Sequence, residues 1–347
     1  MSFLRKILYP FSVVYGEITA ARNTFYNKGI LKSTQFNLPT IVVGNLSVGG
    51  TGKTPQVEYL VRLLEDKYKV AILSRGYKRS TKGFIIADKT STAQDIGDEP
   101  LQYFKKFSNT IVAVDANRVN GIQQLSNLLD KPDVVLLDDA FQHRKVKAGF
   151  TILLTPYNDL YVDDKMLPTG NLREKVSGAN RANLVVVTKC PSHVDENEQF
   201  KISKKLNVKK HQTVFFSTIT YDKKVIGKNN NILISQLSDY NIVLVTGIAK
   251  TKPLTDYLIK QGLKFTHLKY ADHYRFEKKD IEKIRIIFDG ITSDKKIILT
   301  TEKDYVRSFI DSNLKIYYLP IETSFIDHQT DFNKIIIDYV EQSSRNS

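Results

Sequence analysis

A glycine-rich turn between an apolar run and a helical pattern is the strongest constraint on how this chain folds. Residues 40–54 read TIVVGNLSVGGTGKT, and Pro55 and an amphipathic pattern follow. Glycines in such a turn let several backbone N–H groups face one anion, and the amino end of the next helix adds its positive dipole end. Strand, loop and helix stand in the order that a P-loop requires. The segment therefore predicts a triphosphate-binding loop in an α/β fold.

Two residues of this loop have side chains with a defined task. In a P-loop the lysine reaches the β- and γ-phosphates, and the hydroxyl after it ligates Mg²⁺. Lys53 and Thr54 occupy these positions, and Ser47 stands where the usual pattern has glycine. The predicted nucleotide-binding residues are Ser47, Val48, Gly49, Gly50, Thr51, Gly52, Lys53 and Thr54.

A second apolar run ends in two carboxylates. Residues 133–139 read DVVLLDD. In P-loop enzymes an aspartate at the end of such a strand holds the Mg²⁺ shell. Asp138 or Asp139 is expected to do so here, and the sequence does not separate the two. The alternative is that the pair caps the next helix.

Short runs rich in Val and Ile recur along the chain, and most are separated by enough residues for a helix. Runs that are apolar throughout are typical of strands covered on both faces, as in parallel sheets with crossover helices. The expected fold class is α/β: a P-loop NTPase-like α/β/α sandwich with a second, smaller α/β domain and an N-terminal amphipathic helix. The runs are residues 40–43, 70–73, 111–114, 133–137, 151–154, 184–188, 242–246 and 296–300.

A polar, lysine-rich segment interrupts this order. Residues 201–212 read KISKKLNVKKHQ, and the alternating run 213–221 after them is typical of a separate or connecting strand. We place a domain boundary near this segment. The expected division is an N-terminal membrane-docking segment 1–35, a P-loop domain 36–210, and a second α/β domain 211–347 that contributes to the active-site cleft.

The N-terminal segment carries apolar side chains at helical spacing. One apolar face with basic residues beside it is typical of a helix that lies in a membrane interface. Pro10 is expected to kink this helix. The alternative is a helix packed on the protein's own core. The sequence contains no uninterrupted run of 18 apolar residues, so it predicts no membrane-spanning helix. The apolar residues are Phe3, Leu4, Ile7, Leu8, Phe11, Val14, Tyr15, Ile18 and Phe25, and the basic ones are Arg5, Lys6 and Arg22.

Charge and cysteine content limit the partners and the compartment. Lys and Arg number 51 against 37 Asp and Glu, a net charge of +14 that favours an anionic partner. Three kinds of anionic partner are compatible with this positive charge: nucleic acid, anionic lipid and a phosphorylated substrate. Cys190 is the single cysteine, which excludes an internal disulfide and suits a reducing compartment.

Seven motifs follow one another in the order VGNLSVGGTGKTP, SRGY, GDEP, DDAFQH, LPTGNLRE, DHYRF and TEKD, over residues 40–304. This set resembles the tetraacyldisaccharide 4′-kinase family of the lipid A pathway, in whose phosphate loop Ser47 is usual. The resemblance implies transfer of the γ-phosphate of ATP, with Mg²⁺, to the 4′-hydroxyl of tetraacyldisaccharide 1-phosphate, which forms lipid IVA. It also implies a peripheral or monotopic enzyme at the cytoplasmic face of the inner membrane. The implied partners are the membrane glycolipid and an anionic lipid surface, with no nucleic acid and no obligate protein partner.

The resemblance also assigns roles to residues. It implies that Asp98 of GDEP and His273 of DHYRF form the pair that activates the sugar hydroxyl, with Lys53 as the third catalytic residue. The expected metal residues are Thr54, Asp138, Asp139 and Glu99. Arg75, His143 and Arg173 are candidates for binding phosphate groups of ATP or of the glycolipid. Lys78 and Ala140 stand where the family's motifs lead us to expect glycine.

Two other classes fit parts of the sequence. A P-loop GTPase or metal-insertion ATPase shares the loop, but the base-recognition pattern NKxD is absent, and TEKD at 301–304 has the wrong spacing. The role of Lys303 and Asp304 stays unassigned. A nucleic-acid-binding ATPase is suggested only by the charge, since no base-reading module is recognisable.

Overall fold

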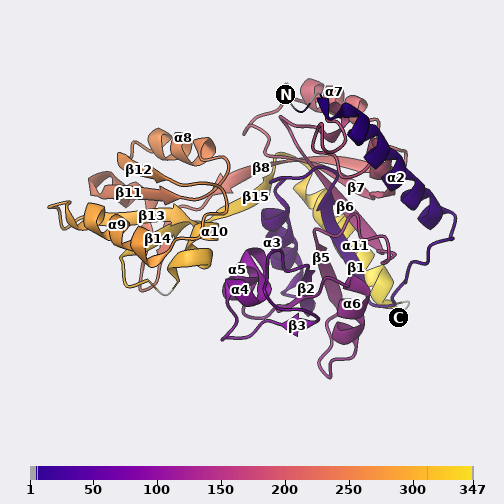
Figure 1. Cartoon of the computed structure of the whole chain (residues 1–347), viewed down its shortest axis with the longest axis horizontal. Helices are drawn as coiled ribbons and strands as arrows, with labels where there is room; N and C mark the ends of the chain where they lie inside the picture. The colour runs from indigo at the N-terminus through magenta and orange to yellow at the C-terminus, as the bar shows by residue number, and fades with distance from the viewer. Residues whose placement is uncertain (1–4, 6, 311, 346–347) are drawn as a thin grey trace. The chain divides into compact units, whose positions relative to one another are not determined.

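The computed structural model describes residues 5, 7–310 and 312–345, and these form two compact units (Figure 1). The first unit holds residues up to 219 and from 323 onward, and the second holds residues 220–322. Each unit has its own sheet and its own buried core. The α/β fold class expected from the sequence is confirmed.

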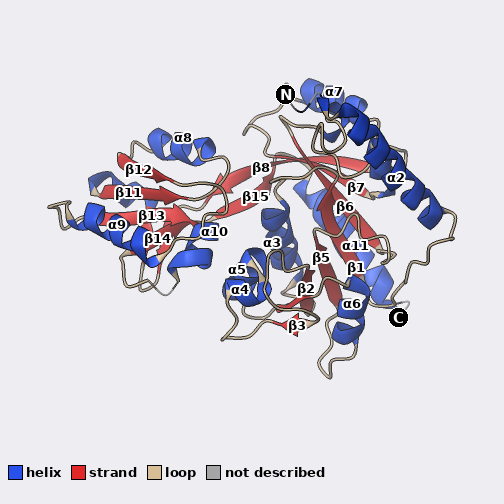
Figure 2. Ribbon diagram, in the orientation of Figure 1, coloured by secondary structure: helices blue, strands red, loops and turns tan. Residues whose placement is uncertain are grey.

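The sheet of the first unit has the strand order β15-β8-β7-β6-β1-β5-β2-β4-β3 (Figure 2). Strand β1 lies between β6 and β5 and pairs in parallel with both, so that Val43 aligns with Ile152 and Asp138. The carboxyl ends of β1 and β5 therefore meet at one edge of the sheet. The strands are β1 (Thr40–Asn45), β2 (Val70–Ser74), β3 (Ile85–Ile86), β4 (Ile111–Val114), β5 (Val134–Asp138), β6 (Phe150–Pro156), β7 (Leu184–Thr188), β8 (Thr213–Tyr221) and β15 (Ile321–Phe325).

Helices cover both faces of this sheet, which explains why its central strands carry no polar side. Side chains alternate between the two faces of a strand. One face packs against Ile122 and Leu206, which belong to α6 and α7. On the other face Tyr59 of α3 contacts Phe332 of α11, with ring centroids 5.9 Å apart. The helices are α2 (Tyr9–Asn27), α3 (Lys53–Leu64), α4 (Ala93–Ile96), α5 (Asp98–Lys106), α6 (Arg118–Ser126), α7 (Glu196–Leu206) and α11 (Gln329–Arg345), with 3₁₀ turns η1 (Tyr161–Asp163) and η2 (Val176–Arg181).

Helix α2 packs on the first unit through small and polar side chains. Ser12 is buried and its hydroxyl donates to Thr169 Oγ1 at 2.6 Å, while Gly16 faces Met166. Pro10 lies in the first turn of α2, where it removes no intrahelical hydrogen bond, and Leu8 just before it is a turn residue between the helical residues Ile7 and Tyr9. The expected kink therefore takes the form of a break in the helix at Leu8.

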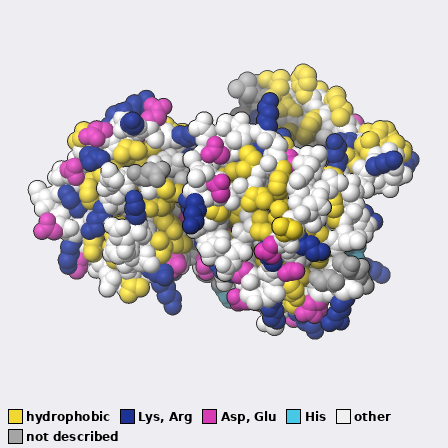
Figure 3. Space-filling model, turned by 90° about the horizontal axis from the view of Figure 1, so that it is seen from below, with side chains coloured by type: hydrophobic (Ala, Val, Ile, Leu, Met, Phe, Trp, Pro, Cys, Tyr) yellow, Lys and Arg dark blue, Asp and Glu magenta, His cyan; other side chains and the backbone are white. Residues whose placement is uncertain are grey.

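The apolar side of α2 is left exposed. Phe11, Val14 and Ile18 keep 66%, 59% and 63% of their surface accessible. Figure 3 shows hydrophobic side chains gathered over this helix at the upper right. These three side chains therefore do not pack on the protein's own core, as the alternative interpretation of this segment required. The predicted residues Phe3, Leu4 and Lys6 lie outside the described residues.

No helix in the described part of the chain combines the length and the hydropathy needed to cross a bilayer.

The second unit is a smaller three-layer α/β structure with strand order β10-β9-β14-β13-β11-β12. Strands β12, β11, β13 and β14 run parallel. Helix α8 packs on one face through Leu258, and α9 packs on the other through Ile284. The elements are β9 (Lys224–Gly227), β10 (Asn231–Leu233), η3 (Ile234–Asp239), β11 (Asn241–Thr246), α8 (Lys252–Lys260), β12 (Phe265–Lys269), α9 (Lys278–Asp289), β13 (Lys296–Thr301), α10 (Glu302–Asp304), the π-helical turn η4 (Tyr305–Phe309) and β14 (Ile316–Leu319).

The boundaries of these units differ from the predicted division at 210 and 211. The lysine-rich segment ends helix α7, and β8 after it pairs in parallel with β7, which places Phe215 and Phe216 in the first unit's core. The chain then returns from the second unit, and α11 packs on the first one. Tyr339 Oη of α11 lies 3.1 Å from both the N–H and the carbonyl oxygen of Thr40, so residues 323–347 do not belong to the second domain.

Candidate active site

The phosphate loop connects the end of β1 to the start of α3. Gly49 and Gly52 have φ of 115° and 90°, in a region that side chains disfavour, so the turn depends on glycine at both positions. Gly52 is the cap of α3 and Lys53 is its first helical residue. The free N–H groups of that first turn face the loop, which is the arrangement that binds a phosphate.

Lys53 is held over the loop by two partners at the ends of adjacent strands. Its ammonium group lies 3.6 Å from Asp139 Oδ1 and 3.4 Å from Asn45 Oδ1. Arg173 approaches the same carboxylate, with Nη1 3.1 Å from Oδ1. Burial raises the pKa of Asp139, but the two cations outweigh it and the net pKa is lowered. Asp139 has φ of 48°, a strained conformation of the kind found at functional sites.

Asp138 has the opposite electrostatic character. Its side chain is buried, and burial together with the charge of Asp139 raises its pKa to about 6. Ser74 Oγ donates to Oδ2 at 3.0 Å, while Oδ1 has no hydrogen-bond partner among the residues that the structure describes. A buried carboxylate oxygen without a donor is costly unless a cation takes that place.

These residues fit Mg²⁺. The ion prefers one or two protein carboxylates together with phosphate oxygens and water, not an all-protein cage. Over the described ranges, no group of three or more His, Cys, Asp or Glu side chains could hold a metal by itself. Asp138 offers its unpartnered oxygen, Thr54 lies in the first turn of α3, and the charge of Glu99 acts on the pKa of Asp138. Asp139 is already paired with Lys53 and Arg173, so Asp138 is the better ligand of the two.

The LPTGNLRE segment lies alongside the phosphate loop. Val48 N–H donates to the Asn171 carbonyl at 2.8 Å, and Arg173 N–H donates to the Leu46 carbonyl at 2.8 Å. This backbone pairing is what delivers the Arg173 guanidinium to Asp139. The sequence predicted Arg173 as a phosphate-binding candidate, but not this pairing.

Gln142 and Glu174 connect these parts and were not among the predicted site residues. Gln142 Nε2 donates to the Asn45 carbonyl at 2.8 Å and to Glu174 Oε1 at 3.0 Å, and its Oε1 accepts from Arg173 at 3.4 Å. Glu174 is buried and also accepts from Asn23 of α2 at 2.7 Å. Gln142 belongs to the motif DDAFQH and Glu174 to LPTGNLRE, so membership of these motifs could have indicated both residues.

Arg118 is a second residue that the sequence did not single out. It is 2% exposed, and its Nη2 donates to the Asp138 carbonyl at 3.0 Å. Arg118 is the first residue of α6 and follows β4 closely. Its place after the carboxyl end of a parallel strand, where ligand sites collect, is the one feature of the sequence that indicates a functional role.

His143 lies among several cations of the first unit. Burial, together with the charges of Arg118, Lys145, Arg22 and Arg75, lowers its pKa to about 4. The imidazole is therefore neutral at pH 7. An anion bound among these cations would reduce their repulsion.

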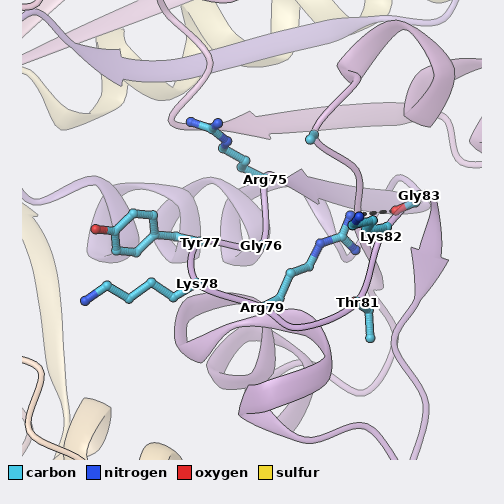
Figure 4. Close-up of a pocket in the computed structure, with 9 residues that line it drawn as sticks. Arg75, Gly76, Tyr77, Lys78, Arg79, Thr81, Lys82 and Gly83 are labelled. Carbon is cyan, nitrogen blue, oxygen red and sulfur yellow. Dashed lines mark hydrogen bonds between the residues drawn. The ribbon is translucent and has the colours of Figure 1, made fainter.

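A pocket of about 370 Å³ opens beside Arg75 and holds cationic side chains but no acidic ones. In Figure 4 the side chain of Arg79 reaches toward Gly83, where Nη2 donates to the carbonyl oxygen at 2.6 Å, and Tyr77 and Lys78 point away from it. The loop follows β2, and Ala116 of the lining follows β4, so the pocket lies at the carboxyl ends of two parallel strands. Its lining is Arg75, Gly76, Tyr77, Lys78, Arg79, Thr81, Lys82, Gly83 and Ala116.

The GDEP segment packs against this same loop. Gly97 has φ of 97°, and an added Cβ would lie 3.3 Å from the Tyr77 carbonyl oxygen. Asp98 and Glu99 form the first turn of α5. Of the two glycines expected from the motifs, the one replaced by Lys78 has φ of 58°, a conformation that favours glycine, whereas Ala140 has no positive φ.

His273 belongs to the second unit, in the loop after β12. Its φ is 57°, and its N–H donates to the Gly247 carbonyl at 3.0 Å. The first unit thus assembles the phosphate loop, Asp138, Asp139 and Arg173 at one sheet edge, while His273 is presented at the carboxyl edge of the second sheet.

The chain is similar to known proteins along nearly its whole length. The profile of the family described as Tetraacyldisaccharide-1-P 4′-kinase matches residues 4–341. A tetraacyldisaccharide 4′-kinase of Flavobacterium johnsoniae is 54% identical over 345 residues, covering 99% of both chains. One of Bacteroides thetaiotaomicron is 44% identical and covers 99% of this chain and 95% of its own.

A solved structure is similar over nearly the whole chain. LpxK from Aquifex aeolicus, in complex with ATP, superposes with a TM-score of 0.78 at 29% identity, covering 97% of this chain and all of its own. The match of the profile over residues 4–341 and the identity of 54% over the full length both rest on far more than the phosphate loop. The chain therefore belongs to the tetraacyldisaccharide-1-phosphate 4′-kinase family.

Proposed function

We infer that this protein transfers the γ-phosphate of ATP to the 4′-hydroxyl of tetraacyldisaccharide 1-phosphate and so forms lipid IVA. The observation that carries this inference is the phosphate loop with Lys53, Asp138, Asp139 and Arg173 at one sheet edge, in a chain 54% identical along its length to a kinase named for this reaction. Residues of this type perform positioning and charge neutralisation, which dominate phosphoryl transfer.

In the reaction, the 4′-oxygen forms a bond to the γ-phosphorus while the bond to the β–γ bridging oxygen breaks and ADP leaves. Lys53, at the start of α3, binds the β- and γ-phosphates, and the helix N–H groups bind their oxygens. Asp138, Thr54 and Glu99 would hold Mg²⁺, which would supply charge neutralisation at the triphosphate. Arg173 neutralises the charge that develops on the transferred group.

The hydroxyl proton passes to the pair formed by Asp98 and His273. An imidazole oriented by a carboxylate is suited to accept a proton at neutral pH. The two residues lie in different units, so the proposal requires both units to engage the acceptor. Replacing either residue with alanine should lower kcat far more than the affinity for ATP. A change confined to KM would contradict the catalytic role.

Arg75 and His143 bind anionic groups of the substrates. Arg75 lines a pocket whose charged side chains are all cationic, and this suits the 1-phosphate of the acceptor. The neutral His143 offers a buried Nε2 that has no partner in the described part of the chain. An imidazole N–H can therefore donate to a phosphate oxygen there.

The protein meets its acceptor at the membrane surface. A glycolipid with four acyl chains leaves a bilayer at a cost of about 0.8 kcal/mol per CH₂, so the enzyme has to come to it. The exposed apolar side of α2 supplies the contact, and a net charge of +14 favours an anionic leaflet. We place the enzyme on the cytoplasmic face, where ATP is available.

A transfer assay with γ-³²P-labelled ATP tests the function. Purified protein is given the glycolipid in phospholipid–detergent micelles, with GTP hydrolysis and nucleic-acid stimulation measured in parallel. We expect label in the glycolipid and none when its 4′-position is already phosphorylated. Lys53→Ala should lower turnover at least about 100-fold, and Lys131→Ala, at an exposed position, should not. Label that appears only as inorganic phosphate would contradict the kinase assignment.

A further inference from the structure

The TEKD segment has no role in the proposed chemistry, yet it contains a buried carboxylate. Asp304 is 0% exposed and lies just after β13, at the carboxyl edge of the second sheet. A buried carboxylate is costly unless several donors satisfy it. Its donors therefore indicate what the residue holds in place.

Asp304 holds the backbone at the end of the neighbouring strand. Its Oδ2 accepts from the Gly247 N–H at 2.9 Å and from Thr301 Oγ1 at 2.7 Å. Gly247 directly follows β11, which pairs with β13 in parallel. A Cβ at Gly247 would lie 3.1 Å from Asp304 Oδ1 and 3.2 Å from Tyr274 Cβ, so the two segments close tightly on this glycine.

The same residue is linked to His273 on both sides. The Gly247 carbonyl accepts from the His273 N–H at 3.0 Å. Arg307, whose side chain is 1% exposed, pairs with Asp304 Oδ1 at 3.2 Å and donates to the Tyr274 carbonyl at 3.4 Å. The Asp304 carboxylate thus fixes Gly247, which accepts from the His273 N–H. Through Arg307 it also fixes the carbonyl of Tyr274, the residue after His273.

His273 needs such a support because of its backbone. A φ of 57° is unfavourable for a residue with a Cβ, by about 1–2 kcal/mol. A strained conformation persists only when its surroundings determine it. Hydrogen bonds to the backbone immediately before and after the strained dihedral are suited to that task.

We propose that Asp304, with Thr301 and Arg307, is a positioning residue that holds the loop 271–274 so that the His273 imidazole is presented for catalysis. This inference rests on the proposed role of His273 and goes beyond it. Asp304 touches neither ATP nor acceptor in this role, and it acts through Gly247 and Arg307. A misplacement of about 1 Å in a reacting group costs up to about 100-fold in rate.

The test is a double-mutant cycle on the full-length protein. Asp304→Asn keeps the volume but turns one acceptor oxygen into a donor that faces either the Gly247 N–H or Arg307. We expect kcat to fall about 10- to 100-fold with the KM for ATP unchanged. In a His273→Ala background the same substitution should change kcat less than about twofold.

Two further variants keep this test decisive. Asp256→Asn makes the same change at an exposed carboxylate of the second unit and should leave kcat unchanged. If Asp304→Asn does not fold, Thr301→Val removes one donor to the carboxylate while keeping the β-branched shape, and Thr301→Ser should restore activity. The same cycle is then run with Thr301→Val.

Additive losses in the His273→Ala background would overturn the inference, because they would mean that Asp304 supports the fold alone. A His273→Ala variant with wild-type kcat would overturn both this inference and the proposed role of His273. A low kcat for His273→Ala with an unaffected Asp304→Asn would overturn the inference only. The two failures are therefore distinguishable.

Discussion

Asp138 and Asp139 are neighbours in the chain, but the fold gives them different properties. Asp139 has a lowered pKa because Lys53 and Arg173 stand beside it, whereas burial raises the pKa of Asp138 to about 6. Carboxyl groups whose environments separate their pKa values usually have separate roles. The strand end alone predicted a carboxylate for Mg²⁺, and the donors around each oxygen favour Asp138.

At the residue scale, His143 predicts a pH dependence of stability. Its pKa is about 4 in the folded protein against 6.5 when unperturbed. Between these values the unfolded chain binds more protons, so the free energy of unfolding falls as the pH drops through this window. We expect His143→Gln to reduce the loss of stability between pH 7 and pH 5, measured by urea unfolding.

His193→Gln is the control for this prediction. His193 is exposed, so its replacement should leave the difference between the two pH values as it is in the wild type. An unchanged difference in His143→Gln would mean that other groups carry the pH dependence.

At the element scale, helix α2 combines two faces with different partners. Ser12 and Gly16 pack on the first unit, while Phe11, Val14 and Ile18 stay exposed. These exposed apolar side chains do not contribute to packing, because α2 is already held by its other face. An exposed apolar stripe of this kind is typical of an interaction site. The sequence periodicity predicted the stripe, and the packing of the small residues shows that it faces outward.

The stripe predicts a measurable contribution to membrane binding. Changing Phe11, Val14 and Ile18 together to serine should remove about 1 kcal/mol for each side chain, or about 100-fold in partition to vesicles. Co-sedimentation with vesicles of anionic phospholipid measures this. Stability should not change, because the three side chains are exposed.

A matched variant separates this contact from general hydrophobicity. Ile259→Ser with Ile286→Ser removes apolar side chains that are 62% and 65% exposed on the second unit. Vesicle binding should be unaffected by this pair. Equal losses in both variants would contradict docking through α2.

At the scale of the whole molecule, the chain leaves the first unit after β8 and returns to it at β15. Helix α11 closes the first unit's core with Phe332, which is 0% exposed and whose ring centroid lies 4.3 Å from that of Phe325. The C-terminal residues are thus part of the nucleotide-binding unit. The polar segment 201–212 carries no information about this return, because it lies more than 100 residues before β15.

This topology predicts separate effects on the two units. Phe332→Ala should cost about 3–5 kcal/mol in the first unit and leave the second unit's stability unchanged. Phe309→Ala, at a residue 1% exposed in the second unit, is the matched change. Hydrogen exchange resolved by segment measures both. Loss of protection across both units from either change would contradict two independent cores.

The sequence by itself determined the elements and the family. All eight Val- and Ile-rich runs are strands, because residues buried on both faces of a parallel sheet leave an uninterrupted apolar signature. The phosphate loop was recognisable because only glycine tolerates its backbone at Gly49 and Gly52. Both signals are local, so neither depends on how distant segments meet.

Tertiary structure alone decided which distant residues act together. Arg173 reaches Asp139 through backbone pairing between segments more than 120 residues apart, and Asp304 reaches His273 through Gly247 of a third segment. The return of α11 to the first unit is a contact of the same long-range kind. Such contacts depend on strand order and register, and no periodicity along the chain encodes them.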